Sequence, residues 1–203
     1  MLHPPPDKPV TPLTVSERAA LLQSFLKTKK EGDGSLHVFA YGSLIWDPCF
    51  AFVERRKARL QGWVRRTCLW SLHARGKPDA PGLVYGLDRE KEGHCHGVVF
   101  TLSKGDIKIS LERLWDREMH TTVYRPTWLD VETSNTITRA IAFVVNRAHP
   151  LYAGTSSPEE AAALIAQAHG KFGSCADYYR DTITALAKQG LEDTTLSSVV
   201  ELL

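Results

Sequence analysis

The chain has 203 residues, of which 43% are hydrophobic and 24% charged, and its formal net charge is +2. This length suits a domain with a substantial core, and the interspersed charges form no basic stripe, which argues against a nucleic-acid partner. Apolar runs are too short to span a membrane, and Met1-Leu2-His3 followed by prolines is unlike a signal peptide, so we expect a cytoplasmic protein.

The first elements along the chain are an arm and a helix. Residues 1–12 carry five prolines and predict a mobile arm. Residues 14–30 predict a helix capped by Thr14 or Ser16, with Gly32 after its end. The apolar stripe of this helix consists of Leu21, Leu22, Phe25 and Leu26.

Strands are expected next. Bulky and β-branched residues bounded by turn residues predict strands at 36–40, 58–71, 83–87 and 97–102. Gly62 lies inside the second of them, which indicates a long strand that is bent or bulged. A helix introduced by Ser103 follows.

The second half of the chain predicts a hairpin and three helices. Two β-rich segments, 121–131 and 136–145, flank a turn at 132–135, and Pro126 marks an edge or a bulge. The helices are expected to begin at or near Ser157, Asp177 and Thr194. The order predicts an α+β fold around a twisted or barrel-like antiparallel sheet. No repeat or linker is visible, so we expect a single domain over residues 1–203, with 1–35 forming an N-terminal arm plus a helix.

Glu118 is the most informative residue of the sequence. On a helical projection of residues 104–119, it follows Leu114 by four residues and Leu111 by seven, on the apolar face. A carboxylate that faces the core is costly unless it is paired, hydrogen-bonded or protonated, and such groups cluster at functional sites. A buried ion pair, for example with an arginine, is the alternative.

Cysteine and histidine give no clear site. Cys49, Cys68, Cys95 and Cys175 include no Cys-x-x-Cys pair, and a reducing compartment would leave them as thiols. His94 and His96 would share a face of a strand, but two ligands do not make a zinc site. We therefore expect no metal and no cofactor.

The segment Tyr41-Gly42-Ser43-Leu44 follows the first strand. Gly42 permits a positive φ and a close approach, and consecutive main-chain N–H groups form an oxyanion-binding concavity. An ordinary turn is the alternative reading of the tetrapeptide alone. The spacing of a phosphate loop and the Gly-x-Ser-x-Gly elbow of serine hydrolases are both absent.

The segment Val38-Phe39-Ala40-Tyr41-Gly42-Ser43-Leu44-Ile45-Trp46 resembles the signature of the ChaC-type γ-glutamylcyclotransferases. So do Trp115-Asp116-Arg117-Glu118-Met119 and Tyr124-Arg125-Pro126-Thr127-Trp128. The resemblance covers about residues 36–190, and the N-terminal helix resembles an extension of the bacterial branch. Ala40 stands where a glycine is common in the family, which matters only if the backbone there needs a positive φ.

The resemblance implies a small, twisted antiparallel or mixed β-barrel-like sheet with flanking helices and a pocket at one end. It also implies cleavage of glutathione to 5-oxoproline and cysteinylglycine, without metal, nucleotide or added water. The family's catalytic carboxylate falls on Glu118, and Tyr178 resembles a tyrosine near the family's pocket. The family's substrate-binding loop falls on Val38, Phe39, Ala40, Tyr41, Gly42 and Ser43. Leu44 is added to the loop because its amide would lie beside those of Gly42 and Ser43.

Arginines would complement the two carboxylates of such a substrate. Arg65, Arg66 or Arg75 could hold one of them by paired hydrogen bonds, and of these we select Arg75; surface charge is the alternative for each. The expected partner is thus a small γ-glutamyl molecule, with no evident obligate protein partner. Two other functions remain open: a cyclotransferase for other γ-glutamyl amines or amino acids, and a non-catalytic regulator that binds a γ-glutamyl metabolite.

Overall fold

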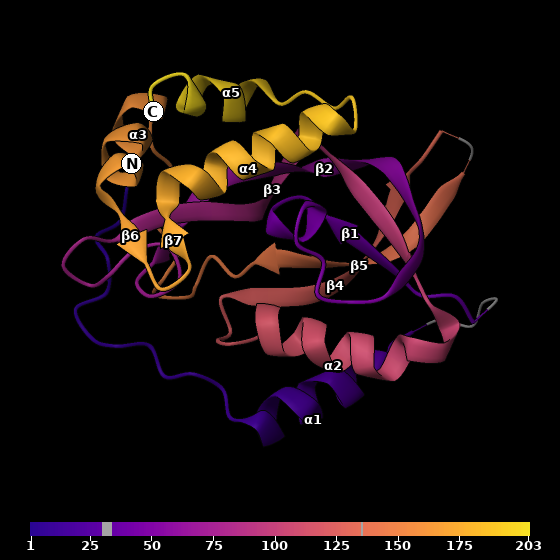
Figure 1. Cartoon of the computed structure of the whole chain (residues 1–203). Helices are drawn as coiled ribbons and strands as arrows, with labels where there is room; N and C mark the ends of the chain where they lie inside the picture. Colours follow the sequence, from indigo (N-terminus) through magenta and orange to yellow (C-terminus); the bar gives the residue numbers. More distant parts are fainter. Residues whose placement is uncertain (30–33, 135) are drawn as a thin grey trace.

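A closed five-stranded barrel forms the centre of the computed structural model, which describes residues 1–29, 34–134 and 136–203 (Figure 1). Around the barrel the order is β1–β3–β2–β4–β5, and β5 returns to pair in parallel with β1 through Val38 and Ile141. The expected α+β fold with a mixed, barrel-like sheet is therefore confirmed. The strands are β1 (His37–Ala40), β2 (Phe52–Ser71), β3 (Gly82–Leu102), β4 (Tyr124–Glu132) and β5 (Ile137–Val145).

The two longest strands, β2 and β3, pair antiparallel along most of their length. The expectation of separate short strands at 83–87 and 97–102 was wrong, because the polar residues between them continue the ladder with β2 instead of forming a loop. Gly62 has a φ of +81° where the register shifts, which confirms the bulge. The predicted hairpin is also confirmed as β4 and β5, and Pro126 lies on an edge, since β4 meets β2 at one residue pair only.

Helices cover two opposite sides of the barrel (Figure 1). The pair α1 and α2 lies on one side, and α3, α4 and α5 lie on the other. No helix within the described residues is long and apolar enough to cross a membrane. The helices are α1 (Val15–Leu26), α2 (Ile107–Glu118), α3 (Pro158–Gln167), α4 (Cys175–Lys188) and α5 (Thr194–Val200). Short 3-10 helices η1 (Ser43–Ile45) and η2 (Lys104–Asp106) and the ribbon of β6 (His169–Gly170) and β7 (Gly173–Ser174) complete the elements.

Helix α1 packs against α2 and β4. Its Phe25 ring stacks on Trp128 with centroids 4.8 Å apart, and Arg18 pairs with Asp116 of α2 at 2.8 Å. The expected stripe is only partly inward, because Leu21 is 38% exposed. The helix ends before the expected residue 30, which lies outside the described residues together with Gly32 and position 135 of the predicted turn.

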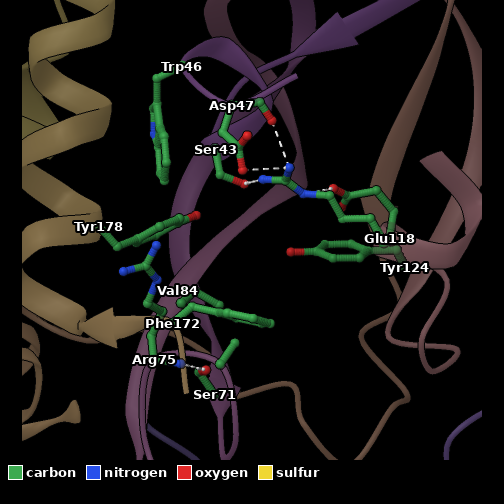
Figure 2. A pocket seen from close by; sticks show the side chains of 12 residues that line it. Ser43, Trp46, Asp47, Ser71, Arg75, Val84, Glu118, Tyr124, Phe172 and Tyr178 are labelled. Atoms are coloured by element: carbon green, nitrogen blue, oxygen red, sulfur yellow. Dashed lines mark hydrogen bonds and ion pairs between the residues drawn. The ribbon is translucent and has the colours of Figure 1, made fainter. Parts of the chain in front are cut away.

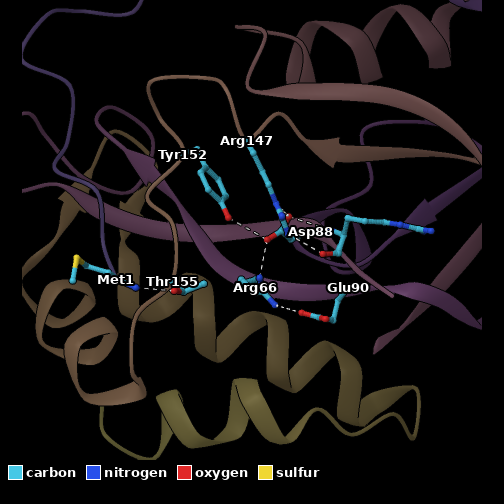
Figure 3. A network of polar contacts seen from close by, with 8 residues as sticks. Met1, Arg66, Asp88, Glu90, Arg147, Tyr152 and Thr155 are labelled. Atoms are coloured by element: carbon cyan, nitrogen blue, oxygen red, sulfur yellow. Dashed lines mark hydrogen bonds and ion pairs between the residues drawn. The ribbon is translucent and has the colours of Figure 1, made fainter. Parts of the chain in front are cut away.

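The arm was expected to be mobile, but its first three residues are tied to the body of the protein. The main-chain N–H of His3 donates to Ala153, and the indole of Trp70 donates to the His3 carbonyl. The terminal amine of Met1 lies 2.9 Å from the Thr155 hydroxyl (Figure 3). The arm is held by main-chain hydrogen bonds to residues 153 and 155, and a local sequence pattern cannot reveal such distant partners.

Buried Asp88 of β3 organises the neighbouring polar network (Figure 3). Its carboxylate accepts hydrogen bonds from Arg66 at 2.9 Å, Arg147 at 2.6 Å and Tyr152 at 3.3 Å. A buried carboxylate is tolerated when several donors satisfy its oxygens. The network ties the chain after β5 to β2 and β3.

Candidate active site

Glu118 is the last residue of α2, and this helix places it against the barrel. Leu111, Leu114 and Trp115 of this helix are each no more than 1% exposed, which confirms the inward face predicted from the periodicity. The Glu118 side chain is 15% exposed. Burial raises the pKa of Glu118 to about 7, and the positive charge of neighbouring Arg117 opposes the rise. A carboxyl group with such a pKa can accept and return a proton near neutral pH.

The turn after β1 lies opposite Glu118 and supplies Gly42 and Ser43. Gly42 has a φ of −136°, so the positive φ that glycine would permit is not used. Close approach is what glycine provides, because a Cβ there would lie 3.3 Å from the Tyr178 hydroxyl oxygen, which would have to shift slightly. No non-glycine residue in the described parts of the chain has a positive φ, so the backbone accommodates Ala40 without strain.

A cavity of about 580 Å³ opens between these elements (Figure 2). A smaller recess of about 30 Å³ shares four lining residues with it, among them Glu118 and Ser43. The size of the cavity is in the range of small-molecule sites. Its walls are Ser43, Trp46, Asp47, Ser71, Ala74, Arg75, Val84, Arg117, Glu118, Tyr124, Phe172 and Tyr178.

The cavity brings together most of the predicted site residues. Ser43, Arg75, Glu118 and Tyr178 line the cavity itself. Val38 and Ala40 line neither space; they are buried within β1, opposite Phe100 and Val98 of β3. Their roles as binding residues remain predictions. The recess is lined by four further loop residues, Phe39, Tyr41, Gly42 and Leu44.

Arg117 links the helix to the turn, a role that the sequence did not reveal. Its guanidinium donates to the Ser43 hydroxyl at 2.9 Å and to the Asp47 carboxylate at 2.9 Å, and its Nε lies 3.6 Å from Glu118. The position directly before Glu118 was the only sequence signal. Arg117 therefore holds the turn in place while its charge acts on the buried carboxylate.

Arg65 and Arg66 do not line the cavity, so the suggestion that either could bind a substrate carboxylate was wrong. The Arg65 side chain, 1% exposed, donates to the main-chain carbonyls of Tyr41 and His96 and pairs with Asp193. Arg66 pairs with Asp88 and Glu90 in the network of Figure 3. Contacts with residues distant in the sequence hold both side chains away from the cavity, so their positions could not be predicted from the local sequence.

No cysteine or histidine is among the described residues that line the cavity or the recess. Burial raises the pKa of Cys95 to about 11 and of Cys175 to about 12, so both stay protonated near neutral pH. The His94 and His96 rings share a face of β3, with centroids 4.9 Å apart. Within the described ranges, no group of three or more His, Cys, Asp or Glu side chains could hold a metal ion.

Comparisons with known proteins converge on one family. The model of a family described as ChaC-like protein matches residues 36–203. The glutathione-specific γ-glutamylcyclotransferase of Escherichia coli (strain K12) is 34% identical over 92% of this chain and 80% of its own length. The human glutathione-specific γ-glutamylcyclotransferase 1 is 29% identical over 74% of this chain and 69% of its own. A yeast γ-glutamyl cyclotransferase crystal structure is similar in fold, with a TM-score of 0.76 at 20% identity over 83% of this chain and 95% of that one.

Proposed function

The chain belongs to the ChaC-like protein family, and we propose that it is a γ-glutamylcyclotransferase that cleaves glutathione to 5-oxoproline and cysteinylglycine. The observation that carries the proposal is the placement of Glu118, a carboxyl group with a pKa of about 7, in a cavity facing a glycine-serine turn. The substrate follows from the relatives, whose names specify glutathione.

In the proposed reaction, the α-amine of the γ-glutamyl group attacks the γ-amide carbonyl carbon of the same molecule. Glu118 removes a proton from the amine as the new C–N bond closes the five-membered lactam. The γ-amide C–N bond then breaks, and Glu118 returns the proton to the departing amine of the cysteinyl residue. Because the attack is intramolecular, the site mainly has to hold the substrate folded back on itself.

The main-chain amides of Gly42, Ser43 and Leu44 are proposed to stabilise the negative charge that develops on the carbonyl oxygen. The first N–H groups of a helical turn have no partner within it, and those at the start of η1 stand at the recess beside Glu118. Tyr178, Phe39 and Tyr41 also line the recess, and the Tyr178 hydroxyl lies close to Gly42.

The first experiment compares wild type with Glu118→Gln. The purified proteins are incubated with reduced glutathione, and 5-oxoproline and cysteinylglycine are followed by mass spectrometry. We expect the variant to keep its fold and substrate binding and to lose turnover by at least about a hundredfold, as for the loss of a general base. Glu112→Gln is the matched control, since Glu112 lies on the exposed face of the same helix.

Each rival function has its own outcome. Turnover of other γ-glutamyl amines or amino acids, without turnover of glutathione, would move the assignment to the broader cyclotransferase. Binding of glutathione without product from wild type would favour the non-catalytic regulator. Comparable turnover in Glu118→Gln would reject Glu118 as the base.

We also propose a cytoplasmic location and a single catalytic domain over residues 1–203. The cysteines are free, as is usual for thiols of a reducing compartment. The substrate is a small molecule, and the proposed reaction requires neither a cofactor nor a protein partner.

A further inference from the structure

We propose that Arg75 binds the glycine carboxylate of glutathione and thereby makes the site favour the tripeptide over γ-glutamyl compounds that lack this group. The inference rests on the proposed function and adds to it the recognition of the far end of the substrate.

Arg75 is the cavity's cation without an acidic partner. The lining contains two arginines; Arg117 is paired with Asp47, whereas Arg75 makes no ion pair with any described residue. Among residues 1–29, 34–134 and 136–203, the guanidinium donates one hydrogen bond, to the Ser174 carbonyl at 3.3 Å. An arginine fork can make two parallel hydrogen bonds to a carboxylate, so this group retains the capacity to bind an anion.

The surroundings hold the Arg75 side chain in place before any ligand arrives. Its guanidinium carbon lies 5.9 Å from the ring centre of Trp46 and 5.5 Å from that of Tyr178. Its main-chain N–H donates to the Ser71 hydroxyl at 2.9 Å. The loop is tight, because a Cβ on Gly76 would lie 2.2 Å from the Gly82 nitrogen. A pre-positioned cation loses little conformational entropy when it binds.

Position across the cavity indicates which substrate carboxylate Arg75 meets. Figure 2 shows Arg75 and Tyr178 on one side and Glu118 and Tyr124 on the other. The α-carboxylate is attached to the same carbon as the reacting amine and therefore stays beside Glu118. A chain of three residues reaches roughly 10 Å when extended, which lets the glycine carboxylate lie on the far side.

The test compares two substrates on two proteins. The substrates are glutathione and its glycinamide, in which the terminal carboxylate is an uncharged amide, and the proteins are wild type and Arg75→Gln. We expect either change alone to lower kcat/KM about ten- to a hundredfold, mainly through KM, and both together to cause no further loss. Arg75→Lys should recover part of the loss with glutathione but none with the glycinamide. Arg113→Gln, on the exposed face of α2, is the control and should change neither substrate.

Two results would overturn the proposal. One is that wild type has the same kcat/KM for glutathione and for its glycinamide. The other is that Arg75→Gln lowers kcat/KM by the same factor for both substrates, as expected for a structural residue or a ligand of the α-carboxylate. Calorimetric binding of both compounds to wild type separates this inference from the proposed function. Wild type could bind glutathione more tightly than the glycinamide, and lose this preference in Arg75→Gln, without forming 5-oxoproline. That result would reject the proposed cyclotransferase activity and support the carboxylate site.

Discussion

The Nε of Arg65 donates a hydrogen bond to the main-chain carbonyl of Tyr41, the residue directly before Gly42 in the turn after β1. The carbonyl and the following N–H of one trans peptide point in opposite directions. An arginine that holds the Tyr41 carbonyl therefore turns the Gly42 amide away from itself. The guanidinium of Arg65 donates to Tyr41, His96 and Asp193, and of these three residues Tyr41 alone lines the recess, so we assign Arg65 a positioning role.

Asp193 is the partner that makes the burial of Arg65 tolerable. Its carboxylate pairs with Arg65 and also caps α5, accepting from the Leu196 N–H at 2.9 Å. We expect Asp193→Ala to lower the free energy of unfolding by about 3–5 kcal/mol, because it leaves a buried charge unpaired. Asp193→Asn keeps a capping oxygen and should recover about 1 kcal/mol of that loss. Urea denaturation of the three proteins measures both values, and equal stability of Asp193→Ala and wild type would contradict the prediction.

Glu118 should make the protein less stable as the pH rises. Its pKa is about 7 in the folded protein and near 4.5 when unfolded, so the folded state binds more protons between these values. The associated destabilisation is absent below pH 4.5 and complete above pH 7, where it is on the order of 3 kcal/mol. Glu118→Gln removes it, so the stability of the variant relative to wild type should increase from pH 4 to 8. A pH-independent difference, measured by denaturation in matched buffers, would contradict a raised pKa.

The pH dependence of activity should depend on the positive charge of Arg117. If Glu118 is the base, as we propose, its carboxylate is the active form, and kcat/KM should fall about tenfold for each pH unit below 7. Arg117 lowers the pKa of Glu118, so Arg117→Gln should move this acidic limb to higher pH, in addition to loosening Ser43. Asp47→Asn is the control, because it alters the partner of Arg117 and leaves the charge beside Glu118. An unmoved limb in Arg117→Gln would show that the charge does not act on the titrating group.

The sequence predicted the parts of this protein that depend on local pattern. Apolar spacing placed Glu118 on the inward face of its helix, and turn residues located the β4–β5 hairpin. The same local view divided β3 into two strands, because pairing with β2 keeps its polar middle extended. It also left the roles of Arg65 and Arg117 open, since their partners stand 24 to 128 and 70 to 74 positions away. Contacts of this kind arise only when the barrel closes.

The contact between Gly42 and Tyr178 offers a final test of the site's geometry. Since the φ of Gly42 is negative, Gly42→Ala places no side chain in the left-handed region, and its new methyl group would lie 3.3 Å from the Tyr178 hydroxyl. That distance requires the tyrosine to shift by a few tenths of an ångström, which we expect to lower kcat/KM about tenfold with little change in melting temperature. Tyr178→Phe removes the crowded oxygen, so Gly42→Ala should cost less in that background than in wild type. Equal losses in both backgrounds would show that the effect of the methyl group does not pass through Tyr178.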